Sequence, residues 1–571
     1  MFVRLKKSSG TVNPIVQIVE SFRELGKVKQ HVLASLGSVR NEQDLVRLQA
    51  LAKSLISKLQ EERVRQKLLF DDTEGQPEIG VLKELPPRRA SGKAGYRPKI
   101  EDIEHRRTIY DGFIAVVESL FAETGFGKIP IKSNRSLAYD PLRIAKILTA
   151  QRFFAPASKL RTYERQADLG IEDLKLHQIY RGMDLLLRAE ELFQRRALAV
   201  ACPPTSPLFK EAIECLFVDV TTLYFESVNT DELRNFGYSK DQKFHSVQVV
   251  LCLVVNSEGL PVAYETFSGN TAEVSTVIPV IEKLKKRFDV TKITIVCDRG
   301  LSSKGNIEHF AANGFNYVAA CKIKHLPENL KLNDPSTFET FEKNSEDEFL
   351  VRRLEHPKYP KSDLIVTWSQ KRAAKDKRDR DKILKRLEGK LGKEPSSPKV
   401  KNLVTNSGYR SFIKIDGGGK WRLNEASIAK SASWDGFHAI AISKSSNLTI
   451  AMALDQYRNL WRVEEAFRVS KSQLEIRPMF HWTPARIRAH VFTCFIALFL
   501  ERYLEKLLRD AGKSQTPDRI RYALQRVHSV HFQDCKTAAI GIMDSSLTPD
   551  ARAIFEVLSL PTKRKTRMLE I

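Results

Sequence analysis

The chain has 571 residues, of which 42% are hydrophobic and 28% are charged. These proportions are typical of a globular protein with several cores, and they exclude an intrinsically disordered chain. Lys and Arg number 93 against 69 Asp and Glu, and the resulting net charge of +24 indicates a polyanionic partner. The seven Cys form no CxxC pair, so neither a zinc ribbon nor a disulfide framework is indicated.

No stretch of the sequence is suited to a membrane. The first ten residues, MFVRLKKSSG, lack an apolar signal core. The longest apolar run, Val491–Leu500, has ten residues and is too short to span a bilayer. We therefore expect a cytoplasmic protein without a membrane partner.

The first 99 residues are expected to form a basic α+β region. Hydrophobic and polar residues alternate in FVRLK, IVQIVESF and KVKQHVLASL, which predicts a small sheet with a hairpin turn at Gly26. Residues 41–70 have the composition of one helix. Residues 85–99 are a Pro/Gly linker with five basic residues and no acidic one. Such a linker is either a solubilising tether or an arm that follows a phosphate backbone.

Residues 100–201 are predicted to be helical. An apolar stripe opens this region, and Pro141 is expected to begin a further helix. Several basic residues on short helices would be exposed and could form a helix-turn-helix module, although most compact helical clusters do not read DNA. The stripe consists of Ile109, Phe113, Val116, Val117, Leu120 and Phe121, and the basic residues are Arg143, Lys146, Arg152, Lys159, Arg161 and Arg165.

The composition changes at Cys202, where short apolar runs begin. The run CLFVDVTTLYFES contains Asp219, and KITIVCDRG places Asp298 directly after an apolar strand. Between them lie two more strand patterns and a helix pattern. This order predicts a ribonuclease H-like α/β fold in which the first and fourth strands are parallel neighbours, with the two carboxylates facing each other. Alternatively, Asp298 simply begins a turn and Asp219 belongs to an edge strand.

The stretch YRNLWRVEEAFRVSK, from Tyr457 to Lys471, contains no Gly or Pro and is predicted to form one amphipathic helix. Steps of seven residues return to within roughly 20° of the same helix face, so Tyr457, Glu464 and Lys471 share one side. Glu464 is either a metal ligand or a rim charge paired with Arg468 at i+4. Trp461 is either part of the core or a platform for an unpaired base.

Two strand-borne Asp and one helix-borne Glu form a possible ligand set for metal ions. Carboxylates from Asp219, Asp298 and Glu464 can hold two Mg²⁺ ions about 3.5–4 Å apart, as two-metal phosphoryl transfer requires. We expect that Mn²⁺ can substitute for Mg²⁺ at such a site.

The order and spacing of these phrases resemble bacterial insertion-sequence transposases of the DDE type, in the branch with the Y-x2-R-x3-E-x6-K signature (the IS-four superfamily). Tyr457, Glu464 and Lys471 match that signature, whereas its Arg falls on Leu460. Further similar phrases are FVDVTTLYFE, GYSKDQKF, FSGNTAE and CDRGLSS. Relatives often carry Arg-Pro-Asp where this chain has Lys243-Phe244-His245.

The resemblance implies an enzyme that binds the inverted-repeat ends of an insertion sequence and catalyses strand cleavage and transfer into target DNA, as a homodimer on DNA. It implies a catalytic triad of Asp219, Asp298 and Glu464, with Tyr457 and Lys471 on the terminal DNA phosphates. Arg458, Arg462 or Arg468 could supply the missing cation, and of these Arg468 alone lies close to the Glu464 face. The alternatives are a non-catalytic DNA-binding protein derived from a transposase and a plain metal-dependent nuclease.

The resemblance also implies a β-rich insertion before the catalytic helix. EDEFLVRRLE, LIVTWSQ and GYRSFIKI have strand patterns, and residues 371–393 form a charged helix pattern that is either a solvated face or a phosphate contact. We expect six regions: 1–99 basic α+β; 100–201 helical and DNA-binding; 202–322 first part of the ribonuclease H-like core; 323–436 insertion; 437–500 second part of the core; and 501–571 helical with a basic tail.

Overall fold

The computed structural model describes residues 2–6, 14–24, 27–39, 49, 100–133, 137, 139–203, 215–225, 229–237, 246–288, 293–343, 348–391, 410–415, 421–477, 479–562 and 566–569. The predictions of a helix over 41–70 and of a linker over 85–99 lie outside the described residues, residue 49 excepted. The same holds for Lys563–Lys565 of the basic tail.

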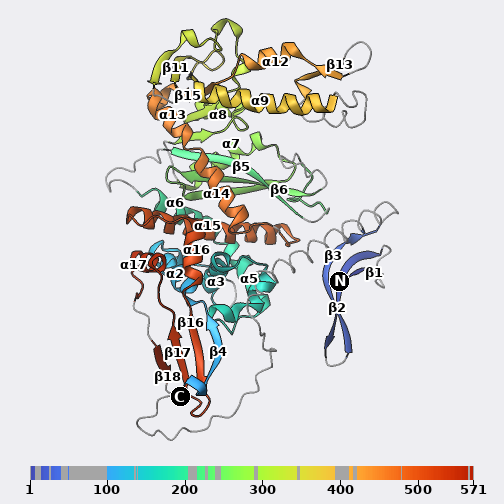
Figure 1. Cartoon of the computed structure of the whole chain (residues 1–571), viewed down its shortest axis with the longest axis vertical. Helices are drawn as coiled ribbons and strands as arrows, with labels where there is room; N and C mark the ends of the chain where they lie inside the picture. Colours follow the sequence, from blue (N-terminus) through green and yellow to red (C-terminus); the bar gives the residue numbers. More distant parts are fainter. Residues whose placement is uncertain are drawn as a thin grey trace.

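The N-terminal strands form a separate antiparallel sheet in the order β1-β2-β3 (Figure 1). Glu24 pairs with Lys27, so β2 and β3 are the two arms of a hairpin, as the alternating pattern predicts. Val16 and Val19 are fully buried, which gives this small sheet an apolar contact. The strands are β1 (Phe2–Lys6), β2 (Ile15–Glu24) and β3 (Lys27–Ser38).

The helical region packs as one layer against a long C-terminal helix, α15 (Pro484–Asp510), and Figure 1 shows this helix between the helical layer and the central sheet. The predicted apolar stripe is buried throughout. Five of its residues lie on α2, and Ile109 lies at the end of the preceding strand. Pro141 begins α3, and the Asp140 carboxylate accepts from the Leu142 N–H as its N-cap. The helices are α2 (Asp111–Glu123), α3 (Pro141–Phe154), α4 (Lys159–Glu164), α5 (Leu176–Leu187) and α6 (Glu190–Ala201).

The prediction that the basic residues of this layer are exposed is wrong for two of them. Arg152 is 5% exposed and Lys159 is 3% exposed, because both lie under α15 and its preceding loop. Arg143 is exposed but is paired with Asp173 through two hydrogen bonds of 2.6 and 2.7 Å. These positions therefore give little support to a helix-turn-helix surface.

A nine-stranded mixed sheet forms the centre of the molecule, in the order β10-β11-β12-β15-β9-β8-β5-β6-β7. β5, β8 and β9 are parallel, and β6 and β7 are antiparallel to their neighbours. Every residue of β6 and all but one of β5 are buried, as expected for strands covered on both faces. The elements are β5 (Cys215–Tyr224), β6 (Gln248–Asn256), β7 (Pro261–Ser268), α7 (Val277–Phe288), β8 (Thr294–Cys297), α8 (Lys304–Ala312) and β9 (Asn316–Ala320).

Two of the strands expected in the insertion, EDEFLVRRLE and LIVTWSQ, extend this same sheet beyond β9, whereas GYRSFIKI supplies a strand of a separate two-stranded sheet. β15 returns antiparallel to β9, and β12, β11 and β10 follow it in antiparallel order. Two consecutive residues of β11, Leu350 and Val351, are buried and the rest of that strand is partly or fully exposed, and a bulge interrupts β10 between Thr340 and Glu342. The bounds are β10 (Glu339–Lys343), β11 (Glu348–Glu355), β12 (Ser362–Ser369) and β15 (Phe437–Ser443).

The charged helix α9 (Gln370–Leu391) forms an arm at the side of the extended sheet (Figure 1). The described part of the arm also contains β13 (Ile413–Ile415), β14 (Trp421–Leu423) and α12 (Glu425–Ala432). A small core of Leu387, Phe412 and Ile413 holds these pieces together. The Arg380 guanidinium donates to Asp435 and fixes the arm to the residues before β15.

The prediction of a wholly helical C-terminal region is wrong. Besides α16 (Pro517–Gln525) and α17 (Pro549–Val557), it contains β16 (Ser529–Asp534), β17 (Ile540–Asp544) and β18 (Thr566–Leu569). These strands form a sheet with β4 (Ile103–Ile109), in the order β18-β17-β16-β4. β4 and β16 lie about 420 residues apart in the chain, so no local sequence pattern indicates that they pair. Within the described part of the chain, no helix has the length and apolarity to cross a bilayer.

Candidate active site

The two aspartates lie on neighbouring parallel strands, as predicted. The pairing of β5 with β8 runs from Cys215↔Thr294 to Val218↔Cys297, so Asp219 and Asp298 are the next residue on each strand. Both side chains are half-buried. Two carboxylates at adjacent positions of parallel strands share one end of the sheet, where α/β folds place their ligands.

Asp298 also organises the turn that follows β8. Its Oδ1 accepts from the Leu301 N–H at 3.1 Å, as a turn aspartate does. A Cβ at Gly300 would lie 3.2 Å from the same oxygen, so the absence of a side chain there keeps the carboxylate accessible. Asp298 can therefore both stabilise this turn and bind a ligand, because the hydrogen bond from Leu301 uses only one lone pair of one carboxylate oxygen.

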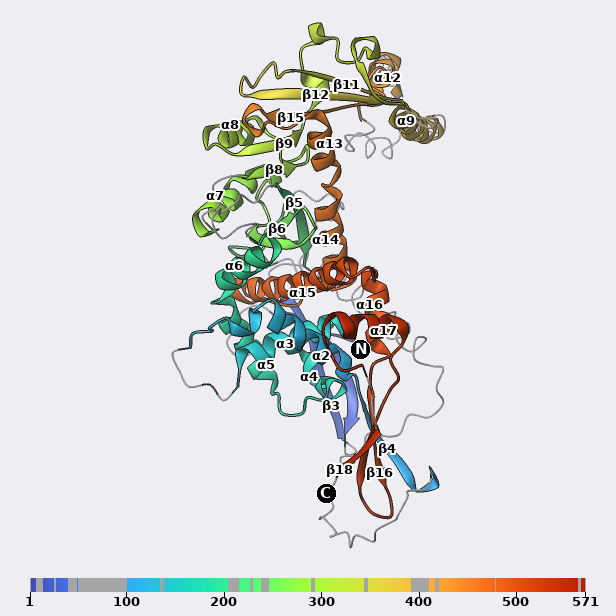
Figure 2. The ribbon, with the colours of Figure 1, turned by 90° about the vertical axis from the view of Figure 1, so that its left-hand side faces the viewer.

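The prediction of one helix over 457–471 is wrong. The chain forms α13 (Ile450–Arg458) and α14 (Trp461–Ser472), and a tightened turn at Asn459 and Leu460 separates them. Figure 2 shows the two helices nearly in line. Leu460, at the position of the signature Arg, is 7% exposed and packs in the core. A buried apolar side chain there fixes the turn but supplies no cation.

Glu464 and Glu465 differ in their surroundings. Glu464 is exposed, and no hydrogen bond or ion pair joins it to another described residue. Glu465 lies 3.3 Å from Arg468 and 3.5 Å from Arg502. The alternative in which Arg468 neutralises Glu464 is therefore wrong: Arg468 pairs with the neighbouring carboxylate and leaves Glu464 available to a ligand.

Lys471 lies beside the strand that carries Asp219. Its Nζ donates to the Thr221 hydroxyl, and it also lies 5.8 Å from the centre of the Phe467 ring. Thr221 and Asp219 are two residues apart on β5 and so share one face of the sheet. The packing of α14 on β5 and β6 thus brings a cation to the face with the first aspartate.

Tyr457 lies near the second aspartate. Its ring is 5.0 Å from that of His438 on β15. Burial, and after it the negative charge of Asp298, raises the pKa of Tyr457 to about 12, so its hydroxyl stays protonated. Arg299 and Arg372 oppose this shift, which places two cations in the same neighbourhood.

Arg372 could not be selected from the sequence, because it is one of many basic residues on the charged helix. Arg372 and Arg299 also contribute to lowering the pKa of His438 to about 4, although burial is the main cause. His438 is therefore neutral at neutral pH. Arg299 was within reach of sequence reasoning, since it directly follows Asp298.

The carboxylates fit a divalent cation only in part. Hard oxygen donors such as those of Asp219 and Asp298 suit Mg²⁺ or Mn²⁺. Among the residues that the structure describes, however, no group of three His, Cys, Asp or Glu side chains is gathered closely enough to hold a metal ion. The structure therefore brings the two aspartates to adjacent strand positions but does not bring Glu464 into one ligand set with them.

Trp461 is 50% exposed, so the alternative that it is a core residue is wrong. The ring lies 5.2 Å from the Arg462 guanidinium and forms one wall of a cavity of about 180 Å³ at the start of α14. The floor of this cavity includes Arg502, Glu505 and Arg509 from α15. An exposed aromatic ring beside arginines is a surface on which a base can stack.

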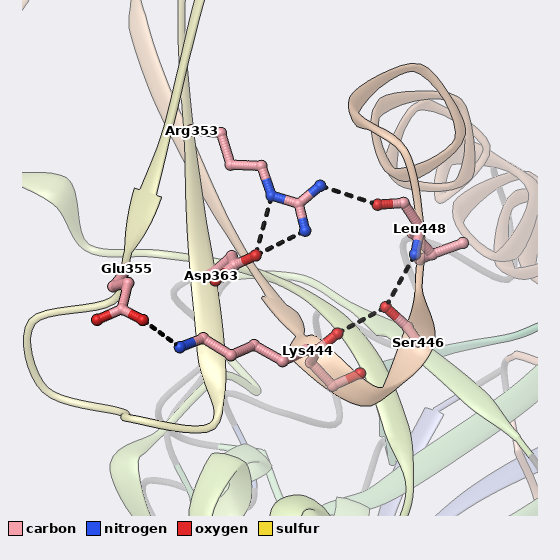
Figure 3. Close-up of polar contacts among 7 residues, drawn as sticks. Arg353, Glu355, Asp363, Lys444, Ser446 and Leu448 are labelled. Carbon is pink, nitrogen blue, oxygen red and sulfur yellow. Dashed lines mark hydrogen bonds and ion pairs between the residues drawn. The ribbon is translucent and has the colours of Figure 1, made fainter.

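A group of polar contacts fixes the start of α13 to the extended part of the sheet (Figure 3). Arg353 on β11 donates to Asp363 on β12 and, at 3.1 Å, to the Leu448 carbonyl just before α13. Lys444 after β15 pairs with Glu355, and the Ser446 hydroxyl accepts from the Leu448 N–H. The residues before Tyr457 are thereby tied to strands that the sequence assigned to an insertion.

The comparisons with known proteins agree with this arrangement. Residues 210–500, about half of the chain, match the family described as "Transposase DDE domain", and residues 2–68 match "IS1634 family transposase, N-terminal domain". A search of curated proteins finds no match. The matched region spans both aspartates, Glu464 and the sheet that positions them, and the chain thus belongs to the DDE transposases of insertion sequences.

Proposed function

We propose that the protein binds the inverted-repeat ends of its insertion sequence and catalyses metal-dependent cleavage and strand transfer, with Asp219, Asp298 and Glu464 as catalytic residues. The observation that carries this proposal is the parallel register of β5 and β8, which sets Asp219 beside Asp298 within the matched transposase domain. The order β7-β6-β5-β8-β9, with the first and fourth strands adjacent, supports a ribonuclease H-like core.

The two aspartates and Glu464 would hold Mg²⁺ or Mn²⁺ when DNA is bound. Bound ions would activate a water molecule or a DNA 3′-hydroxyl and stabilise the leaving oxygen. Because Glu464 is exposed and without a partner among the described residues, an approach of α14 towards β5 breaks no ion pair of that side chain. We infer that DNA binding completes the ligand set.

Tyr457 and Lys471 would position the DNA rather than react with it. The Tyr457 hydroxyl, whose pKa is about 12, stays neutral and can donate to a phosphate oxygen. Lys471 is a point charge on the face of β5 with Asp219, and it can release Thr221 in favour of a phosphate. Arg299 and Arg372, near Tyr457, would replace the cation that Leu460 does not supply.

Two exposed residues of α14 complete the proposed interface. Trp461 would stack on an unpaired base of the opened end, which is commonly worth about 1–3 kcal/mol. The Arg468 side chain is 58% exposed and, among the described residues, pairs with Glu465 alone, so it can turn towards a phosphate. Because two ends must be joined to one target, we expect a homodimer on DNA.

A plasmid that carries the gene's flanking inverted repeats tests the proposal. With Mg²⁺ the parent protein should cut at the repeat boundaries and join the released ends to a second plasmid. Asp298→Asn should bind the repeats equally well but neither cut nor join, whereas Asp510→Asn, an exposed change at the end of α15, should behave as the parent.

Cleavage without joining would show a plain nuclease, and binding without cleavage by the parent would show a non-catalytic protein. Either result overturns the proposed strand transfer.

A further inference from the structure

The chain that leaves α14 presents two aromatic side chains to solvent. Over residues 479–482 the side chains alternate: Met479 is buried and His481 is half-buried, whereas Phe480 is 57% and Trp482 is 48% exposed. The two exposed rings are separated in the chain by the half-buried His481.

Arginine and aromatic side chains continue from these two rings to the end of β5. The Arg234 guanidinium lies 5.9 Å from the centres of both the Trp482 and Phe225 rings. Arg477 lies 5.4 Å from the ring of Tyr224, the last residue of β5. Phe480, Trp482, Arg234 and Arg477 together form what we call the aromatic surface. It adjoins the strand that carries Asp219, five residues before Tyr224.

The base of the aromatic surface is rigid. The Arg234 side chain is 6% exposed and donates to Asp231 at 2.7 Å. The Gly269 N–H donates to the Leu233 carbonyl at 3.0 Å. A Cβ at Gly269 would lie 2.4 Å from the Asn235 carbonyl oxygen, so only glycine permits this contact. Arg234 is therefore held in place beside the Trp482 ring, which remains 48% exposed.

The charge around the aromatic surface suits a polyanion. Three carboxylates nearby are each paired with an arginine: Asp231 with Arg234, Glu232 with Arg488 at 3.6 Å, and Asp184 with Arg486 at 2.6 Å. Paired carboxylates repel a phosphate much less than free ones. The stretch 471–490 itself contains four Lys or Arg and one Glu.

We propose that the aromatic surface binds unpaired nucleotides of the DNA strand that passes the catalytic carboxylates, with bases stacked on Phe480 and Trp482. Bases inside a duplex already stack on one another, so exposed rings select single strands. The inference rests on the proposed function for the identity of the partner as DNA. A protein partner fits less well, because the rings are interleaved with arginines rather than grouped in one apolar patch.

Fluorescence anisotropy without divalent metal tests the inference directly, with a labelled (dT)15 oligonucleotide and a blunt 15-base-pair duplex as probes. Trp482→Ala and Phe480→Ala should each weaken (dT)15 binding about tenfold, within the range usual for a stacking residue. Duplex affinity should change less than twofold. Trp482→Tyr should restore most of the (dT)15 affinity, because a stacking ring is retained.

Tyr522→Ala is the matched control. Tyr522 is 58% exposed and lies 5.5 Å from Arg526, but its helix, α16, packs on α2, α3 and α17 rather than on β5. It should leave both affinities unchanged. Unchanged (dT)15 binding by Trp482→Ala would overturn the inference, as would an equal loss for both probes. A shift from dimer to monomer in sedimentation, with (dT)15 affinity intact, would assign the surface to a second copy instead.

These binding assays need no cleavage. Loss of the proposed catalytic function in the plasmid experiment and loss of the aromatic surface in this one are therefore separate results.

Discussion

Two groups of charged residues lie beside α14, one near its start and middle and one at its end, and they differ in their hydrogen-bond and ion-pair partners. Beside β5 and β8, Asp219 and Asp298 are half-buried and Glu464 is exposed, and Glu464 has no partner among the described residues. At the end of α14, Arg152 donates to the Leu474 and Glu475 carbonyls, and Arg521 donates to the Gln473 carbonyl. The carboxylates of the first group are available to a bound ligand, whereas the arginines of the second group already donate to backbone carbonyls.

The difference teaches that residue type alone does not identify a DNA contact. Arg152 and Lys159 have the same pattern in the sequence as surface phosphate contacts, yet both are buried. The buried Arg152 makes charge-assisted hydrogen bonds to the Leu474 and Glu475 carbonyls, which lie just beyond the end of α14. Burial and partners, rather than charge, separate the residues that hold α14 from those that are available to DNA.

The largest expected effect concerns the accessible group. Glu464→Gln keeps the size of the side chain but removes the charge that a hard cation needs, so end cleavage should fall by at least roughly 10³-fold. End binding and the melting temperature should remain those of the parent. Gel-shift, cleavage and thermal-melting assays on one preparation measure all three.

Glu465→Gln is the control for that change. It weakens the contacts with Arg468 and Arg502, so it should lower the melting temperature but retain cleavage. If Glu465→Gln loses cleavage while Glu464→Gln keeps it, the carboxylate assignment on α14 is wrong. If both variants cleave, the third ligand lies elsewhere.

A smaller effect, on stability, is expected in the second group. Arg521→Met leaves the Phe153 and Gln473 carbonyls without their donor and should cost about 2–4 kcal/mol of unfolding free energy. Arg519→Met, two residues earlier, removes only an exposed ion pair with Asp550 and should leave the urea midpoint nearly unchanged. Equal midpoints for the two variants would contradict the role of Arg521 as an anchor at the end of α14.

Two further effects on stability, no larger than the last, should depend on pH with opposite signs. Burial lowers the pKa of Lys159 to about 7 and raises that of Glu501 to about 7. The native lysine is destabilising below pH 7, and this penalty fades between pH 7 and its unfolded pKa near 10.5. The native glutamate is destabilising above pH 7, and its penalty fades as the pH falls towards 4.5.

Lys159→Met should therefore stabilise the protein by on the order of 1–4 kcal/mol at pH 6 and much less at pH 9.5. Glu501→Gln should stabilise it by on the order of 1–3 kcal/mol at pH 8 and hardly at pH 5. Urea titrations at these pH values measure both. Gains that do not vary with pH would show that packing, not charge, sets the difference.

Sequence reasoning was most successful where the pattern is local. The apolar runs around Asp219 and before Asp298 predict buried strands, and their parallel pairing is confirmed. The hairpin at the start of the chain is confirmed by the pairing of Glu24 with Lys27. In each case hydrophobic periodicity and a turn residue are enough, because burial on two faces or alternation on one leaves few other arrangements.

The remaining features depend on contacts that the sequence does not encode locally. The turn at Leu460 arises because that side chain packs in the core, and a tertiary contact overrides a helical pattern. Trp461 is exposed because the turn redirects the first residue of α14 towards the cavity beside α15. Pairing of β4 with β16 joins residues over 400 positions apart, and no periodicity reports on it.

The outermost strand of the central sheet has a consequence for assembly. β10 has only five residues, ETFEK, of which three are charged, and its register breaks between Thr340 and Glu342. Long, flat and apolar edges recruit further strands and lead to open-ended aggregation, which short, charged and bulged edges resist. A sheet of nine strands built by extension at one edge therefore ends in a strand that cannot be extended again. We therefore do not expect a second copy of the chain to pair with the sheet at β10.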